Sequence, residues 1–129
     1  MRRGLSIAYS GAAWVVFLLT LVQFFLAGLG FFDPSVGFDA HETVGYILHG
    51  ITILVFLLAL AGPRTGRDIG MGFALGVIAT IQVALPELRD DAPVLAAFHP
   101  LVALVILGLS AHIGSRYLPR GRASAPATV

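Results

Sequence analysis

Apolar residues occur along this chain in four long runs, which are separated by short segments of polar and turn-forming residues. We expect helices over about 5–31, 40–62, 69–88 and 92–117. A helix needs ~20 apolar residues to cross about 30 Å of hydrocarbon, and each run has that length. Short connections favour antiparallel neighbours. The pattern therefore predicts an all-α integral membrane protein, an up-down-up-down four-helix transmembrane bundle.

The four runs leave no room for a separate soluble domain, so we expect one transmembrane domain over residues 1–118. Residues 119–129 are small, polar and proline-containing, which predicts a disordered cytoplasmic tail. The first run follows Met-Arg-Arg, as in a signal peptide. It is longer than the ~7–15 apolar residues of a signal sequence, so we interpret it as a permanent span.

Composition supports a membrane protein and excludes several chemistries. The chain has 129 residues, of which 57% are hydrophobic and 12% are charged. A soluble domain carries about 25% charged residues. There are no cysteines, which excludes disulfides, iron–sulfur clusters and thiolate catalysis. We expect a lipid bilayer as the surroundings and no nucleic-acid partner.

Charged residues are distributed unequally between the two sides of the predicted bundle. Seven arginines fall on one side: Arg2, Arg3, Arg64, Arg67, Arg116, Arg120 and Arg122. Arg89 falls on the other side with six acidic residues: Asp33, Asp39, Glu42, Glu87, Asp90 and Asp91. Because cytoplasmic loops collect Arg and Lys, we expect a multi-pass protein of the bacterial cytoplasmic membrane with both termini in the cytoplasm.

One pattern of polar residues occurs twice. Gln23 is followed eighteen positions later by His41, and Gln82 is followed seventeen positions later by His99. Each histidine lies near the start of a long apolar run, and a small residue follows four positions on: Gly45 in the first case and Ala103 in the second. This correspondence predicts an internal two-helix repeat, with both histidines at similar depth near the outer face.

Two matched histidines on two membrane helices are suited to holding one metal centre. Zinc takes three or four protein ligands, whereas haem needs only two axial ligands because the porphyrin supplies four nitrogens. The sequence therefore predicts one haem b bound by His41 and His99. We assign Gly45 and Ala103 to the same site, because a flat macrocycle beside a ligating histidine requires small neighbours.

Buried glutamine amides need hydrogen-bond partners. Gln23 and Gln82 could bond to each other, orient the nitrogens of His41 and His99 that bind no metal, or join helices across the bundle. All three alternatives remain open from the sequence.

Arg89 has two interpretations. As the single cation on its side, it could pair with haem propionates, or it could form a salt bridge with Glu87, Asp90 or Asp91. We include it among the candidate cofactor-binding residues.

The other two histidines do not form a second matched pair. We expect His112 at the membrane interface, and His49 bonded to Gln82, to Thr80 or to a carbonyl. Pro100 either bends a helix that begins near residue 92 or occupies the first turn of a helix that begins near His99.

The runs VQFFLAGLGFF, FDAHETVGYILH and AAFHPLVALVILGLSA resemble a family of small four-span bacterial membrane proteins of unknown function, over about residues 14–117. The resemblance rests on Gln23, Gly28, His41, Gly45, His99 and Pro100. More distantly, the layout resembles one half of haem A synthase and other b-type cytochrome bundles. That resemblance implies an outer-side haem histidine on the second and fourth helices, and only His41 and His99 carry over. Synthase activity would require a homodimer, since the chain supplies one half.

The sequence thus favours a cytochrome b-like membrane protein for electron transfer or redox sensing, with a quinone or a redox protein as partner. It leaves open whether the chain acts as an oxidoreductase enzyme. Two alternatives are a cofactor-free module for membrane-complex assembly and a divalent-metal site for binding or transport, formed by His41, Glu42 and His99.

Overall fold

The computed structural model describes residues 2–118, and every regular element in that range is helical. The elements are α1 (Arg2–Phe32), α2 (Asp39–Ala61), α3 (Gly66–Ala84), the 3-10 helix η1 (Leu85–Leu88), α4 (Pro93–Ala96) and α5 (His99–Gly114). The all-helical prediction is therefore confirmed over these residues. The prediction of a disordered tail concerns residues 119–129, which lie outside the described residues.

Four helical segments in residues 2–118 are long and apolar enough to cross a membrane: Arg2–Phe32, Asp39–Ala61, Gly66–Leu88 and Pro93–Gly114. They correspond to the four apolar runs of the sequence. Large apolar side chains are exposed along their surfaces, for example Phe25 (68% exposed) and Phe73 (57% exposed).

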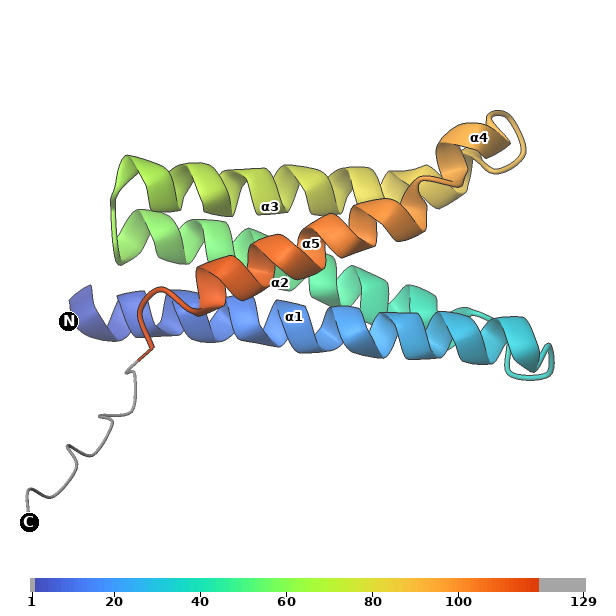
Figure 1. Cartoon of the computed structure of the whole chain (residues 1–129), viewed down its shortest axis with the longest axis horizontal. Helices are drawn as coiled ribbons and strands as arrows, with labels where there is room; N and C mark the ends of the chain where they lie inside the picture. The colour runs from blue at the N-terminus through green and yellow to red at the C-terminus, as the bar shows by residue number, and fades with distance from the viewer. Residues whose placement is uncertain (1, 119–129) are drawn as a thin grey trace, which may run out of the picture.

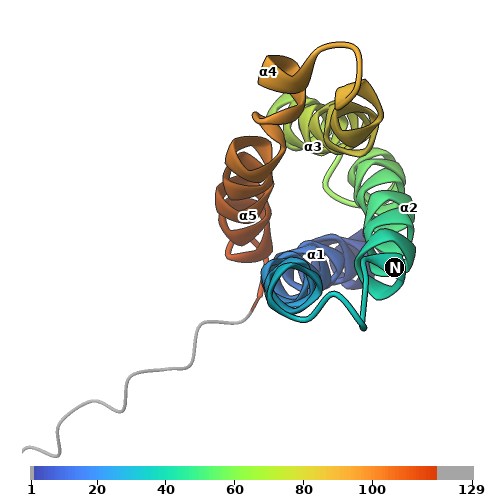
Figure 2. The ribbon, with the colours of Figure 1, turned by 90° about the vertical axis from the view of Figure 1, so that its right-hand side faces the viewer.

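The helices form a ring in which each long helix contacts two others. α1 packs against α2 and α5, and α3 packs against the same two helices. Figure 2 shows this ring, with α2 and α5 on opposite sides. In Figure 1 the N-terminus, the α2–α3 turn and the last turn of α5 lie at one end, which we call the arginine end. The α1–α2 loop and α4 lie at the opposite end, the histidine end.

A heptad-like core holds the arginine half of the ring together. Buried residues recur every three or four positions, as expected for helices that pack side by side. On α2 they are Leu48, Thr52, Val55 and Ala59; on α3 they are Asp68, Gly72, Leu75 and Ala79; on α5 they include Ile106, Ser110 and Ile113. A Cβ on Gly72 would lie 3.1 Å from the Cα of Phe56, so α2 and α3 approach closely there.

This core stops halfway along the bundle. Thr20, Leu48, Ala79 and Ile106 are its last buried residues toward the histidine end. Beyond them, Gly30 is the one buried position among the described residues, and it lies against the backbone of the loop that follows α1. The half of the bundle that contains His41 and His99 therefore has no core of fully buried side chains.

The fourth helical segment differs from the expected continuous helix over 92–117. α4 ends at Ala96, and α5 begins at His99 with Pro100 in its first turn. Because proline has no N–H group, the helical bond from residue 100 to the carbonyl of Ala96 cannot form. The first-turn interpretation of Pro100 is therefore the one observed, and α5 ends at Gly114.

Candidate functional site

His41 and His99 come together at the histidine end. Their ring centroids are 6.0 Å apart, with 61° between the ring planes. His41 is in the first turn of α2, and His99 is the first residue of α5, so each side chain leaves the N-terminal end of its helix. Both residues are half-buried. Two residues separated by 58 positions in the sequence thus meet from opposite sides of the ring.

Each histidine makes the same contact with the preceding long helix. The Nδ1 of His41 lies 3.1 Å from the backbone oxygen of Gln23, and the Nδ1 of His99 lies 2.9 Å from the backbone oxygen of Gln82. A carbonyl oxygen can only accept, so Nδ1 must carry the proton in both rings. In the neutral imidazoles the lone pair is therefore on Nε2, for which residues 2–118 supply no hydrogen-bond partner.

Both glutamines meet the histidines through their backbone carbonyls, and Gln23 also contributes its side chain. The Nε2 of Gln23 donates to the backbone oxygen of His41 over 2.9 Å, which joins α1 and α2. The Oε1 atoms of Gln23 and Gln82 are buried, and neither has a hydrogen-bond partner among the described residues. Leaving a buried acceptor unpaired costs about 1–3 kcal/mol. Two such unpaired acceptors therefore occur, one on α1 and one on α3, on the residues whose backbone carbonyls contact the histidines.

The two small residues assigned to the site differ in what surrounds them. A Cβ on Gly45 would lie 2.8 Å from the Nε2 of Gln23, so the missing side chain makes room for that amide. That Gly45 also leaves space for a macrocycle stays a prediction. Ala103 is half-buried, one helical turn beyond His99.

Arg89 forms a surface ion pair with Asp90, with 3.8 Å between its Nε and the carboxylate. The two side chains are 80% and 87% exposed, so the pair adds at most about 1 kcal/mol to stability. Of the two interpretations of Arg89, the structure shows the salt bridge.

The remaining candidates lie apart from the pair. His49 places its Nε2 3.0 Å from the hydroxyl of Thr80, one of its three expected partners. Within residues 2–118 there is no group of three His, Cys, Asp or Glu side chains that could hold a metal ion. His41, Glu42 and His99 are therefore not arranged as a three-ligand group in this structure.

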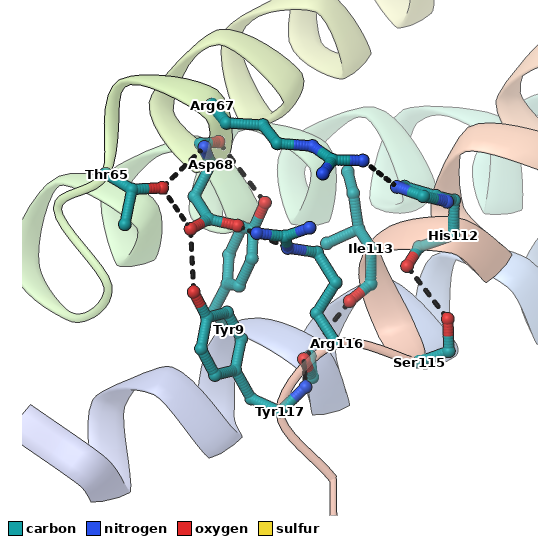
Figure 3. A network of polar contacts seen from close by, with 10 residues as sticks. Tyr9, Thr65, Arg67, Asp68, His112, Ile113, Ser115, Arg116 and Tyr117 are labelled. Carbon is teal, nitrogen blue, oxygen red and sulfur yellow. Dashed lines mark hydrogen bonds and ion pairs between the residues drawn. The ribbon is translucent and has the colours of Figure 1, made fainter.

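A second polar cluster lies at the arginine end and was not predicted. Asp68 is fully buried, and Figure 3 shows its carboxylate surrounded by donors from the segment after α5 and from the turn that precedes α3. The Nε of Arg116 donates to it over 2.6 Å, and the hydroxyl of Tyr117 donates over 2.7 Å. The hydroxyl of Thr65 also donates to it. The cluster ties the end of α5 to the start of α3.

The electrostatics of this cluster favour an ion pair. Burial and the contact with Asp68 raise the pKa of the Tyr117 hydroxyl, so that it stays protonated and can donate. The hydrogen bond to Asp68 raises the pKa of the Arg116 guanidinium. Two sequence signals were available: Thr65 and Asp68 have the spacing of a helix-capping motif, and Asp68 is the single acidic residue on the arginine side.

Comparison with known proteins identifies a family but no characterised relative. A family model described as DUF6220, a family of unknown function, matches residues 23–88, just over half of the chain. The matched range begins at Gln23 and contains His41 and Gln82, whereas His99 lies beyond it. No curated protein and no solved structure matches the chain, and nothing in these comparisons supports the distant resemblance to haem A synthase. The chain belongs to the DUF6220 family.

Proposed function

We propose that this protein is a cytochrome b-like protein of the bacterial cytoplasmic membrane, which holds one haem b between His41 and His99 for electron transfer or redox sensing. The observation that carries the proposal is the pair of adjacent imidazoles. Each imidazole has its Nδ1 bonded to a backbone carbonyl, which leaves the Nε2 lone pair free.

The histidine contacts fit haem ligation. A metal-binding histidine almost always donates its other N–H group to a carbonyl, carboxylate or water, which fixes the tautomer and the orientation of the ring. Both rings make such a contact. A centroid separation of 6.0 Å also suits two metal–imidazole bonds of about 2 Å each together with the ring radii. Two axial ligands are sufficient for haem.

The packing of the bundle supports a bulky apolar occupant at the same place. The buried core ends before the histidine half begins, and cofactors of helical bundles sit between the helices. The chain's contribution would be to fix the axial ligands and to exclude water. A bound haem would supply one-electron redox chemistry, tuned by its ligands and their hydrogen bonds.

We propose membrane insertion as an up-down-up-down bundle with an internal two-helix repeat and both termini in the cytoplasm. Two observations support it. All four candidate spans expose large apolar side chains, and all four are helical, which satisfies the backbone polar groups that lipid cannot bond. The arginines at one end favour a cytoplasmic location for that end. The histidine pair would then lie near the outer face.

The position of the haem determines what partner is needed. A single cofactor near one face does not bridge ~30 Å of hydrocarbon. We therefore propose that electrons are exchanged at the histidine end, with a quinone or a redox protein.

A cofactor-free assembly module is the second candidate. The observation in its favour is that the contacts from His41 to Gln23 and from His99 to Gln82 join neighbouring helices directly. Such polar contacts stabilise helix packing in membranes without any metal.

The absorbance spectrum of protein purified from a haem-replete host separates these functions. We expect a strong Soret band in the oxidised protein and sharp α and β bands after reduction. A colourless preparation that takes up zinc would contradict haem binding and support the divalent-metal alternative. A colourless preparation that binds neither would support the assembly module.

A further inference from the structure

An open pocket lies at the arginine end of the bundle, far from the histidine pair. Its volume is about 400 Å³, and it is lined by Arg67, His112, Ser115, Arg116 and Tyr117. Figure 3 shows the side chains of Arg67 and Arg116, from α3 and the segment after α5, on the same side of the cluster as His112.

Positive charge in this pocket is not balanced by the described residues. Arg67 is exposed, and its Nη2 contacts the Nε2 of His112 at 3.2 Å. The salt bridges found within residues 2–118 join Arg89 to Asp90 and Arg116 to Asp68, so Arg67 takes part in neither. Because a guanidinium nitrogen can only donate, this contact requires Nε2 of His112 to accept with its lone pair. An anion between the two side chains would remove that restriction.

Hydrogen bonds hold the residues that line the pocket in place. Arg116 uses its Nε to contact the buried Asp68, and a guanidinium has five N–H donors, so others remain available on its terminal nitrogens. The backbone N–H of Tyr117 donates to Ser10, and the hydroxyl of Ser115 donates to the carbonyl of His112. Ser10 in turn donates to the carbonyl of Ile113. The segment that carries Arg116 is thereby fixed against α1.

Asp68 does not cancel the charge of Arg67. It is fully buried, and its carboxylate already accepts from Arg116, Tyr117 and Thr65. The other six acidic residues of the chain lie in or beside the loops at the histidine end. The pocket thus combines the guanidinium of Arg67, which has no acidic partner in residues 2–118, the imidazole of His112 and the further N–H donors of Arg116.

We propose that this pocket binds a phosphate group, either in the head group of an acidic phospholipid or as free phosphate. The planar fork of an arginine matches the oxygens of a phosphate group. Basic pockets between spanning helices on the cytoplasmic side bind anionic head groups. The site is independent of haem binding, because its residues are at the opposite end from His41 and His99.

The test compares the intact protein with Arg67→Gln and His112→Gln, and uses Arg3→Gln as the matched control. Arg3 is exposed on the same end but does not line the pocket. In the lipid arm, nanodiscs contain phosphatidylcholine with or without phosphatidylglycerol, and native mass spectrometry counts the lipid retained by each chain. In the phosphate arm, the thermal unfolding midpoint is measured in inorganic phosphate and in chloride of equal ionic strength.

We expect wild-type protein to retain one phosphatidylglycerol in preference to phosphatidylcholine, or to be stabilised by inorganic phosphate; the arm that responds identifies the source. Arg67→Gln should lower the affinity for the ligand of the responding arm by about tenfold, the loss expected when a hydrogen bond to a charged group is removed. His112→Gln should weaken it in the same direction, and Arg3→Gln should not. No response in either arm, or an equal loss in Arg3→Gln, would overturn the proposal.

Discussion

Replacing Asp68 with alanine should lower the free energy of unfolding by about 3 kcal/mol, because breaking a buried ion pair leaves its partner charge uncompensated. Asp68 is fully buried, and the Arg116 side chain is 21% exposed. The substitution also removes the acceptor of the Tyr117 hydroxyl. The measurement is reversible denaturation of each variant in the same detergent, followed by circular dichroism.

The control is Asp90→Ala, which removes the exposed ion pair with Arg89. Surface pairs of this kind contribute about 0–1 kcal/mol, so this variant should remain near wild type. The double variant Asp68→Asn with Arg116→Gln should recover part of the loss, since removing both charges leaves no unpaired ion. If Asp68→Ala and Asp90→Ala are equally stable, the cluster does not hold α3 and α5 together.

The second large effect concerns the histidines. His41→Ala and His99→Ala should each lower the haem content of the purified protein by at least about tenfold, because even the loss of a group that orients a ligand costs 10–100-fold in affinity. Each substitution removes one of the two free Nε2 lone pairs and leaves the other ring without an opposite partner. Haem is measured as haem per chain after purification.

His49→Gln is the matched control, since His49 lies on the same helix as His41 and contacts Thr80 instead of the pair. It should retain the haem content of the wild type. The same haem content in His41→Ala and in wild type would show that the metal is held elsewhere. An equal loss in His49→Gln would show that the loss reflects a general disruption of α2.

The sequence was sufficient to predict four long helices and the meeting of the two histidines. The apolar runs are long enough to cross a bilayer, and they emerge as four helical segments of that length. His41 and His99 could be brought together from the sequence because each follows a glutamine at nearly the same distance. Between each glutamine and its histidine the chain leaves one helix, passes through a loop and enters the next. The histidine Nδ1 then lies beside the backbone carbonyl of the glutamine.

Other features depend on contacts that the spacing of residues does not encode. Asp68 and Arg116 are 48 positions apart, and neither belongs to a repeated pattern. The break before His99 depends on which helical bond Pro100 prevents, and both positions of the proline were consistent with the sequence. The close approach of the Gln23 amide to Gly45 could not be predicted either, because it depends on the direction taken by the side chain of Gln23.

The most direct measurement is electron paramagnetic resonance of the oxidised protein, together with a haem-to-chain ratio. Ligation by both imidazoles predicts a low-spin ferric signal and one haem per chain. High-spin ferric iron, one haem for every two chains, or protein without haem would each contradict a haem held between His41 and His99 of the same chain.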